Sequence, residues 1–284
     1  GAARDVKSEK PILAVFMSAR GVPDALRTSE VEIPSYAFPE DAAIALARVA
    51  RYGAWLAKPV EAPPRVEARR DEAAAIVAKA LGRGGGWLEP AEIAALLACY
   101  GLPVIEQRLV SDAEQAGLAA GAIKRPVALK AIAPGVLHKT EAGAVRLDLR
   151  TADEVRRAAA EMAAALAAHG HAPTGFIVQP MAPKGVEMIV GVVHDPSFGP
   201  VIACGAGGVL VELVRDVAVG LAPLGKVDAA EMVRSLKTYP LLTGFRGEPA
   251  RDVSALEEAL LRVSALAEDL PEVAEVDCNP IIVA

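Results

Sequence analysis

The stretch that most constrains the fold runs from Val127 to Val145, VALKAIAPGVLHKTEAGAV. A short apolar run is broken at Pro134 and Gly135, and a second run follows in which apolar and polar residues alternate. This order predicts a strand, a loop and a second strand. Lys130 lies in the first run, and a lysine in a buried strand is costly unless an anion meets it.

His138 lies on the predicted loop, close to the glycine and proline that let a loop move. Histidine exchanges protons near neutral pH and can act as a nucleophile. A phosphate-binding lysine followed by a loop histidine indicates phosphoryl transfer. The alternative is a salt-bridged strand lysine and a solvated histidine, and this stretch by itself leaves both readings open.

The composition narrows the class of protein. The 284 residues are 53% hydrophobic and only 4% aromatic, which is typical of an α-rich or α/β protein with a large core. The sequence has no uncharged apolar run of about 18 residues, so we expect no membrane span. The N-terminal stretch GAARDVKSEK lacks an apolar signal core, so we expect a cytoplasmic protein.

The net charge argues against a nucleic-acid-binding protein, and the cysteine spacing argues against disulfide-rich and zinc-binding proteins. The net charge is −6 and the pI is about 5.4, whereas binding to a phosphate backbone needs a basic surface, so nucleic acid is not an expected partner. Cys99, Cys204 and Cys278 are far apart and show no C-x-x-C spacing. Neither a disulfide framework nor a zinc site is therefore expected.

The N-terminal part resembles the end of a larger domain. Within residues 1–60, Pro11–Met17 has the pattern of a fully buried parallel strand, a second short strand lies near Ser35, and a helix begins at Pro39. Two strands and a helix cannot form a sheet domain alone. Residues 61–87 combine a linker rich in proline and charge with a connecting helix.

The remaining residues, 88–284, show an α+β pattern of helices and antiparallel hairpins. Capping residues predict helix starts at Ser111–Asp112 and at Thr151. Leu102–Gln107 is predicted as a strand, and Ile281–Val283 as the last strand.

Three more segments carry residues that suit a ligand. The predicted strand Gly175–Met181 is interrupted by a proline, so backbone donors and acceptors near its end are available to bind the edge of an adenine. Glu187 lies on the next predicted strand, and its carboxylate could bind ribose hydroxyls or face solvent. A glycine-rich turn with Gly207 and Gly208, followed by Glu212, allows close approach of a ligand. An ordinary strand end or turn explains each segment equally well when it is taken alone.

Asp277 and Asn279 are two residues apart, so on a strand their side chains share a face. Their oxygens suit Mg²⁺, which also takes phosphate oxygens and waters. A solvated strand end is again the simpler explanation of this pair alone. Taken together with Lys130, these signals match binding of a nucleoside triphosphate with Mg²⁺ between two α+β lobes.

Four segments in combination resemble the NDP-forming acyl-CoA synthetase family and its ATP-grasp module: VALKAIAPGVLHKTEAGAVRL, IVQPMAPKGVEMIVGVVHDPSFGPVIACGAGGVLVELVRDVA, YPLLTGFRG and VAEVDCNPIIV. The chain is more distantly similar to the β subunit of succinyl-CoA synthetase. The resemblance implies an ATP-grasp fold of two α+β lobes over residues 88–284. It also implies that residues 1–60 are the end of the family's flavodoxin-like CoA-ligase domain.

The resemblance implies an acid–thiol ligase (ADP-forming) that interconverts acyl-CoA, ADP and phosphate with acid, CoA and ATP. In this family an acyl phosphate forms, and histidines carry its phosphoryl group to ADP. His138 matches the swinging-loop histidine, and Lys130 matches the phosphate-binding lysine. Gln179 and the backbone of Met181 match the adenine hinge, where relatives often carry a glutamate, and Glu187 matches an acid that contacts ATP.

The expected cofactors are ATP or ADP and Mg²⁺. Asn279 matches a magnesium ligand of the family, Asp277 is a second candidate ligand, and Glu212 is placed to approach the metal or the phosphates. Gly207 and Gly208 are the expected close-approach positions for the nucleotide.

The expected partners are upstream CoA-binding and ligase domains, in the same polypeptide or in a separate α subunit, which bind acyl-CoA and CoA. The chain lacks those domains and the first phosphohistidine, so we do not expect it to be fully active alone. Assembly into a homo-oligomer is left open. The alternative functions are a regulatory acyl-CoA-synthetase-like domain of a bacterial protein lysine acetyltransferase, which binds ligand without turnover, and a structural domain with a vestigial site.

Overall fold

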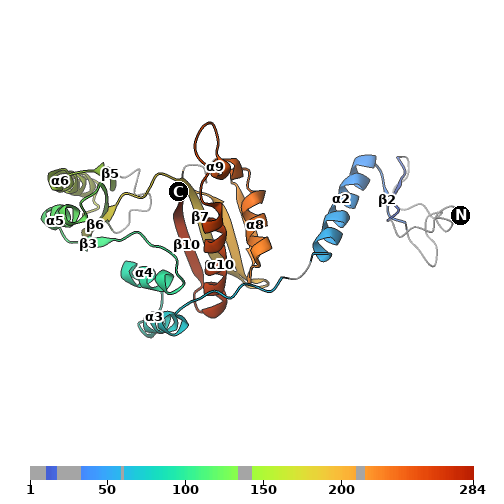
Figure 1. Ribbon diagram of the computed structural model, residues 1–284, viewed down its shortest axis with the longest axis horizontal. Coiled ribbons are helices and arrows are strands. Elements are labelled where there is room, and N and C mark those ends of the chain that lie inside the picture. Colours follow the sequence, from blue (N-terminus) through green and yellow to red (C-terminus); the bar gives the residue numbers. More distant parts are fainter. Residues whose placement is uncertain (1–10, 18–32, 59–60, 134–142, 209–214) are drawn as a thin grey trace. The chain divides into compact units, whose positions relative to one another are not determined.

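The computed structural model describes the chain apart from residues 1–10, 18–32, 59–60, 134–142 and 209–214 (Figure 1). The chain divides into two units, Gly1–Glu61 and Ala62–Ala284. None of the helices in the described ranges combines the length and the apolar character needed to span a bilayer.

The first unit contains β1 (Ala14–Val15), β2 (Ser35–Tyr36) and α2 (Pro39–Leu56). The helix begins, as predicted, at Pro39, where the missing N–H costs nothing because the first turn has no acceptor for it. The predicted parallel strand within Pro11–Met17 is confirmed, because β1 pairs with β2 in parallel, but its predicted full burial is wrong. The two strands pair over only two residues, which covers little surface, and Met17 is 77% exposed.

The second unit opens with a helical hairpin of α3 (Arg70–Gly82) and α4 (Pro90–Cys99). The glycines after α3 end the helix, as predicted, and Gly84, Gly85 and Gly86 all adopt positive φ. Glycine reaches this region without the steric cost that a Cβ atom imposes. The hairpin contributes Val77, Leu96 and other residues to the core of the second sheet.

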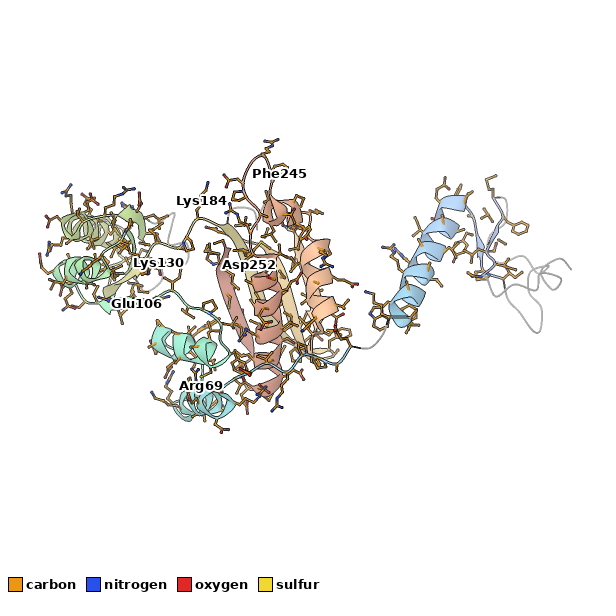
Figure 2. The ribbon with its side chains drawn as sticks, in the orientation of Figure 1. Arg69, Glu106, Lys130, Lys184, Phe245 and Asp252 are labelled. Atoms are coloured by element: carbon orange, nitrogen blue, oxygen red, sulfur yellow. The ribbon has the colours of Figure 1, made fainter. Side chains whose placement is uncertain are left out.

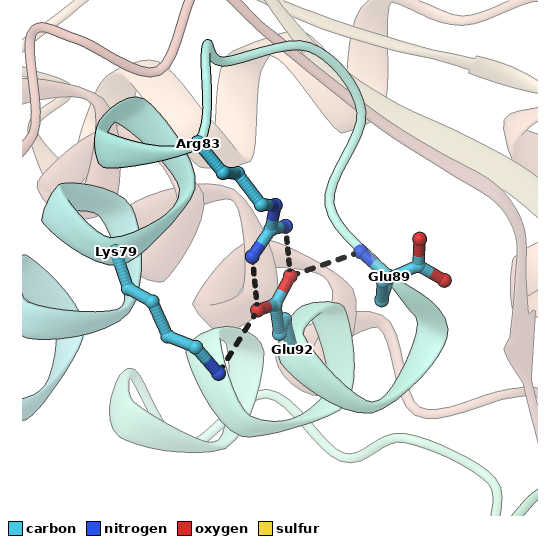
Figure 3. Close-up of polar contacts among 4 residues, drawn as sticks. All are labelled: Lys79, Arg83, Glu89 and Glu92. Carbon is cyan, nitrogen blue, oxygen red and sulfur yellow. Dashed lines mark hydrogen bonds and ion pairs between the residues drawn. The ribbon is translucent and has the colours of Figure 1, made fainter.

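One carboxylate, that of Glu92, joins the two helices of the hairpin (Figure 3). Arg83 engages both of its oxygens, with Nη1 at 2.6 Å from Oε1, and the Glu89 N–H donates at 3.1 Å. The Lys79 Nζ lies 3.6 Å away. The hydrogen bonds from Arg83 and Glu89 lower the pKa of Glu92 from 4.5 to about 2, because they favour the ionised form.

The first sheet has four antiparallel strands in the order β3-β6-β4-β5. These strands are β3 (Arg108–Val110), β4 (Val127–Ile132), β5 (Val145–Leu149) and β6 (Gly175–Pro180). The helices α5 (Ala113–Ile123) and α6 (Ala152–Ala168) pack on one face, around Leu129, Phe176 and Val178. The predicted capping box is confirmed at Thr151, whose hydroxyl accepts from the Glu154 N–H at 3.2 Å.

The second sheet has four antiparallel strands in the order β10-β7-β8-β9. These strands are β7 (Val186–Asp195), β8 (Gly199–Ala206), β9 (Val217–Leu221) and β10 (Glu275–Val283). The helices α8 (Lys226–Ser235) and α10 (Val253–Asp269) lie across one face (Figure 1), and the short α9 (Tyr239–Thr243) follows α8. Met188, Val190 and Ile202 are buried beneath these helices, in one core with Leu260 of α10.

The structure corrects three features of the sequence-based prediction. Leu102–Gln107 is not a strand: β3 begins at Arg108, opposite Val178, and further pairing would run past Pro180, which ends β6 and has no N–H. The strand β9 was not predicted. The last strand begins at Glu275, well before Ile281, because its acidic first half pairs with β7.

Candidate functional site

Lys130 and Gln179 lie on the same face of the first sheet (Figure 2 labels Lys130). In the register of β4 and β6, Gln179 is opposite Ala128, and Lys130 is opposite Ile177. Residues two apart on a strand share a face, so Lys130 and Gln179 are diagonal neighbours with Cα atoms about 7–8 Å apart. Both are half-buried, whereas Leu129 and the rest of the other face pack against the helices.

An adenine hinge at the end of β6 would need backbone groups that are free to bind the base, but the N–H of Met181 already has a partner. The Met181 N–H donates to the Pro126 carbonyl oxygen at 2.8 Å. The Met181 Sδ accepts from the Asp148 N–H at 3.5 Å. The N–H of Met181 is therefore already used within the sheet, which limits a hinge here to the Gln179 side chain and to other backbone groups.

The face of the second sheet opposite α8 and α10 carries several side-chain oxygens, on β7 and on the edge strand β10. Glu187 is the second residue of β7, and its side chain is exposed. On β10, Asp277 and Asn279 are exposed and alternate with the partly buried Cys278, as side chains on one face should. The register of β10 shifts between Cys278 and Ile281, so Asn279 lies at the start of an irregularity in the strand.

Small and apolar side chains form the floor of the same face. Two cross-strand rows make up this floor, Val193–Val201–Leu221 and Gly191–Ala203–Val219. Val193, Val219 and Leu221 are each more than half exposed, at 58%, 66% and 53%. The face therefore suits a ligand with a flat apolar part and a polar part near β10. The sequence analysis missed this floor because it did not recognise β9.

Gly207 and Gly208 approach Glu187 too closely for a side chain. The Gly207 N–H donates to the Glu187 carbonyl oxygen at 2.8 Å, and a Cβ on Gly207 would lie 2.8 Å from the Glu187 carbonyl carbon. Gly208 has a φ of +59°, and a Cβ there would overlap the Glu187 carboxylate. The contact with β7 therefore requires both glycines, and it places the Glu187 carboxylate beside this turn.

Asp277 and Asn279 provide the donor atoms that Mg²⁺ prefers, a carboxylate and an amide oxygen. Within the described ranges, no group of three or more His, Cys, Asp or Glu side chains is arranged to hold a metal ion. This donor set fits an ion that completes its coordination with phosphate oxygens and water, as Mg²⁺ does.

Asp216 is a buried carboxylate that the sequence analysis did not identify. It accepts hydrogen bonds from the Lys237 N–H at 2.9 Å and from the Thr238 N–H and hydroxyl, both at 2.7 Å. Burial alone would raise the pKa of Asp216, but these hydrogen bonds outweigh burial and lower it. Asp216 thereby ties the start of β9 to the α8–α9 connection, and no capping or spacing signal in the sequence marks it.

Burial disfavours the thiolate form of two cysteines in the second sheet, Cys204 and Cys278. Burial raises the pKa of Cys204 to about 12 and that of Cys278 to about 11, and the nearby charges of Asp216 and Asp277 act in the same direction. The thiolate is the form that attacks electrophiles and binds metals. The raised pKa therefore favours the protonated thiol of both residues at neutral pH.

The described residues do not include every predicted site residue. His138 and Glu212 lie outside them, within 134–142 and 209–214. The described candidates fall on two sheets, with Lys130 and Gln179 on the first and Glu187, Asp277 and Asn279 on the second.

Comparisons with known proteins identify the fold. A family model described as an ATP-grasp domain matches residues 79–284. The β subunit of acetate–CoA ligase (ADP-forming) I from Pyrococcus furiosus is 38% identical over 210 residues, which are 72% of this chain and 89% of that subunit. Acetate–CoA ligase (ADP-forming) I from Archaeoglobus fulgidus is 37% identical over 280 residues, which are 96% of this chain but only 40% of that ligase.

Solved structures agree with the sequence matches. The dinucleotide-forming acetyl-coenzyme A synthetase 1 of Ca. Korarchaeum cryptofilum, in complex with coenzyme A, Ca-AMPCP and HgCl⁺, has a TM-score of 0.68 at 39% identity, over 74% of this chain and 93% of that chain. A second structure of that synthetase, with Mg-AMPPCP and its phosphohistidine segment pointing towards the nucleotide binding site, has a TM-score of 0.64. The predicted ATP-grasp fold is confirmed. The chain belongs to the ATP-grasp family, among the β subunits and C-terminal regions of the ADP-forming acyl-CoA synthetases.

Proposed function

We propose that this chain binds ADP or ATP with Mg²⁺ between its two sheets and relays a phosphoryl group through His138. The overall reaction would be the interconversion of acyl-CoA, ADP and phosphate with acid, CoA and ATP. Upstream CoA-binding and ligase domains, in the same polypeptide or in an α subunit, would supply the acyl phosphate chemistry.

The observation that carries this proposal is how the strand registers group the candidate side chains. Lys130 and Gln179 share one face of the first sheet, and Glu187, Asp277 and Asn279 share one face of the second. Each sheet packs its other face against helices, so the candidates occupy the faces that remain for a ligand.

In the direction of ATP synthesis, an oxygen of the ADP β-phosphate forms a P–O bond to the phosphoryl group as the P–N bond to His138 breaks. The imidazole leaves with the electron pair of that bond. Lys130 would stabilise the negative charge on the phosphoryl oxygens, and Gln179 would orient the adenine. Mg²⁺, when bound through Asp277 and Asn279, would neutralise phosphate charge.

The regulatory alternative, a ligand-binding domain of a protein lysine acetyltransferase, gains no support from the relatives. The Pyrococcus and Archaeoglobus proteins are both named as ligases, and one Korarchaeum structure is described with a phosphorylated phosphohistidine segment. Ligase chemistry is therefore the better-supported function for the same set of side chains.

The test uses the chain alone, because attack of His138 on the ATP γ-phosphate needs no acyl group. After incubation with Mg²⁺ and ATP labelled in its γ-phosphate, the chain should carry a label that is stable to base and labile to acid. His138→Ala should abolish the label. Lys130→Met should slow labelling by about 100-fold, the typical cost of losing a group that stabilises transition-state charge.

Lys184→Met is the matched control, because it removes a lysine whose Nζ pairs with Glu248 at 3.1 Å on the surface (Figure 2). It should label like the unmodified chain. Labelling of His138→Ala at the normal rate would refute the relay, and equal rates for Lys130→Met and Lys184→Met would refute the role of Lys130.

A further inference from the structure

A second feature of the fold lies beside the outer edge of β10. A half-open cavity of about 380 Å³ lies between this strand, α3, α4 and the Gly85–Leu88 segment. Its volume falls in the range of ligand pockets, which begins at about 300 Å³. Its walls are mainly apolar and include Val77, Leu96 and Trp87, whose side chain is 78% exposed.

The strand β10 ends the second sheet, and among the described strands it pairs with β7 alone. The His194 N–H donates to the Ala274 carbonyl oxygen at 3.3 Å, which identifies these opposed residues as a hydrogen-bonded pair. Hydrogen-bonded and non-hydrogen-bonded pairs alternate along an antiparallel ladder. The backbone N–H and C=O groups of Glu275 and Asp277 therefore point away from β7, towards the edge that the cavity borders.

The side chains along this edge also have a pattern. Glu275 and Asp277 are exposed on one face, whereas Val276 and Cys278 are partly buried on the other. Glu272 adds a third carboxylate to the lining, and no Lys, Arg or His is among the lining residues in the described part of the chain. The cavity thus joins an apolar wall, a row of acids and strand-edge backbone that pairs with no further strand in the described ranges.

We propose that this edge binds an extended segment of a partner polypeptide, which adds a fifth strand to the sheet next to β10 and alternates basic with apolar side chains. The basic side chains would lie beside Glu275 and Asp277, and the apolar ones beside Val276 and Cys278, because opposed residues of neighbouring strands share a face. The backbone groups of Glu275 and Asp277 would complete the ladder, as in other cases of strand addition.

The acidic side chains and the outward backbone groups of β10 together favour one kind of ligand for this edge over the alternatives. The acids along the edge disfavour an acidic segment or an anion, since like charges in opposed strands repel. A small apolar molecule would fill the cavity but would leave the outward backbone groups of β10 without partners. A basic and apolar strand satisfies the wall, the acids and the backbone together. Asp277 is also a candidate magnesium ligand, so this edge adjoins the proposed nucleotide site, and the variants that test the edge change Glu275 and leave Asp277 in place.

The test uses Trp87 as the reporter. The chain has two tryptophans, so Trp55→Phe leaves Trp87 as the only one. The probes are two synthetic hexapeptides, one that alternates valine and lysine and one that alternates valine and glutamate. We expect the lysine peptide to change the Trp87 emission saturably and the glutamate peptide to leave it unchanged.

Two pairs of variants separate this site from general attraction to an acidic protein. Glu275→Lys should weaken binding of the lysine peptide about tenfold or more, whereas Glu161→Lys, the same charge change on the exposed surface of α6, should have little effect. Glu275→Pro deletes one outward N–H and should bind several-fold more weakly than Glu275→Ala, which keeps it. Circular dichroism would verify that each variant is folded.

Three outcomes would overturn the proposal. The first is equal binding of both peptides. The second is an equal loss for Glu275→Lys and Glu161→Lys. The third is self-association of the chain that Glu275→Lys abolishes while the lysine peptide remains unbound, which would make a second copy the occupant.

Discussion

Two glycines determine where the Glu187 carboxylate lies. Gly207 donates its N–H to the Glu187 backbone, and Gly208 leaves room for the Glu187 side chain. The glycine-rich turn was predicted as a place where a ligand approaches the chain. The structure shows a more direct reason for these glycines, because the first close neighbour of this turn is the strand β7 itself.

Replacing Gly207 should therefore cost more stability than replacing Gly208. A Cβ on Gly207 meets backbone atoms that cannot move away, so we expect Gly207→Ala to lower the free energy of unfolding by about 2–3 kcal/mol. Gly208→Ala meets the end of a flexible side chain and adds the strain of a positive φ, at about 1 kcal/mol. Urea unfolding of both variants measures the difference.

Gly121→Ala in α5 is the control for this pair. A Cβ at Gly121 has no neighbour within 4 Å, and alanine is the better helix former, so this variant should be neutral or slightly stabilising. If Gly208→Ala proved more destabilising than Gly207→Ala, the backbone contact would not be what requires glycine.

The sequence patterns predicted which strand or face a residue lies on better than they predicted its hydrogen-bond partners. Periodicity and chain breaks placed Lys130 on a strand and Asp277 and Asn279 on one face. They could not show that the Met181 N–H is bonded to Pro126, because that contact depends on how two strands align. Asp216 was missed for a similar reason, since its partners Lys237 and Thr238 are distant in the sequence.

At the scale of elements, the α3–α4 hairpin depends on one carboxylate. Glu92 draws donors from both helices, and its side chain is 15% exposed (Figure 3). The same hairpin meets α10 through other groups: the Arg70 Nε lies 2.8 Å from Asp269, and the Arg262 Nη1 donates to the Tyr100 carbonyl oxygen at 2.7 Å. These contacts hold the hairpin beside the second sheet.

The contribution of Glu92 to stability should disappear in acid. Its pKa is about 2 in the folded chain against an ordinary 4.5, so the ionised carboxylate stabilises the fold above pH 4.5. This stabilisation is lost progressively as the pH falls towards 2. The difference in urea midpoint between the unmodified chain and Glu92→Gln should therefore be full at pH 6 and shrink steadily below pH 4.5.

Glu161→Gln, which neutralises an exposed carboxylate on α6, is the matched variant. It should show a small difference from the unmodified chain at pH 6. A Glu92→Gln difference that stayed constant between pH 6 and pH 3 would show that the ion pair contributes nothing to the stability of the hairpin.

The sequence predicted most elements but not the extent of the sheets. Helices with caps, such as α6 behind Thr151, were placed correctly because capping is local. The strand β9 and the first half of β10 were missed, since their pairing depends on neighbours far along the chain. Leu102–Gln107 resembled a strand by composition, yet Pro180 on the opposed strand ends the ladder before it.

For the whole molecule, the two hydrophobic cores determine what can fold independently. Both cores draw all their buried residues from the unit Ala62–Ala284. By contrast, the first unit leaves Val49, Trp55 and Leu56 each 60% exposed. The assignment of residues 1–60 to the end of a flavodoxin-like domain stays a prediction, and such exposed side chains are typical of a helix that packs against further structure.

A chain restricted to residues 62–284 should fold and take up the phosphoryl label. Since neither core loses a residue, we expect its Tm to differ from that of the full chain by less than about 4 °C, the shift that 1 kcal/mol produces in a domain of this size. Differential scanning calorimetry measures the Tm. A loss of the cooperative transition would show that residues 1–61 are needed for the cores to form.

The high pKa values of Cys204 and Cys278 have a practical consequence. Maleimides react with thiolates, and Cys99 and Cys204 are also buried. A single cysteine introduced on the surface near Lys184 should thus accept a fluorophore selectively while the native thiols stay unmodified. With a second introduced cysteine on the first sheet to carry the partner fluorophore, the movement of one lobe against the other could be followed by energy transfer without first removing any native cysteine.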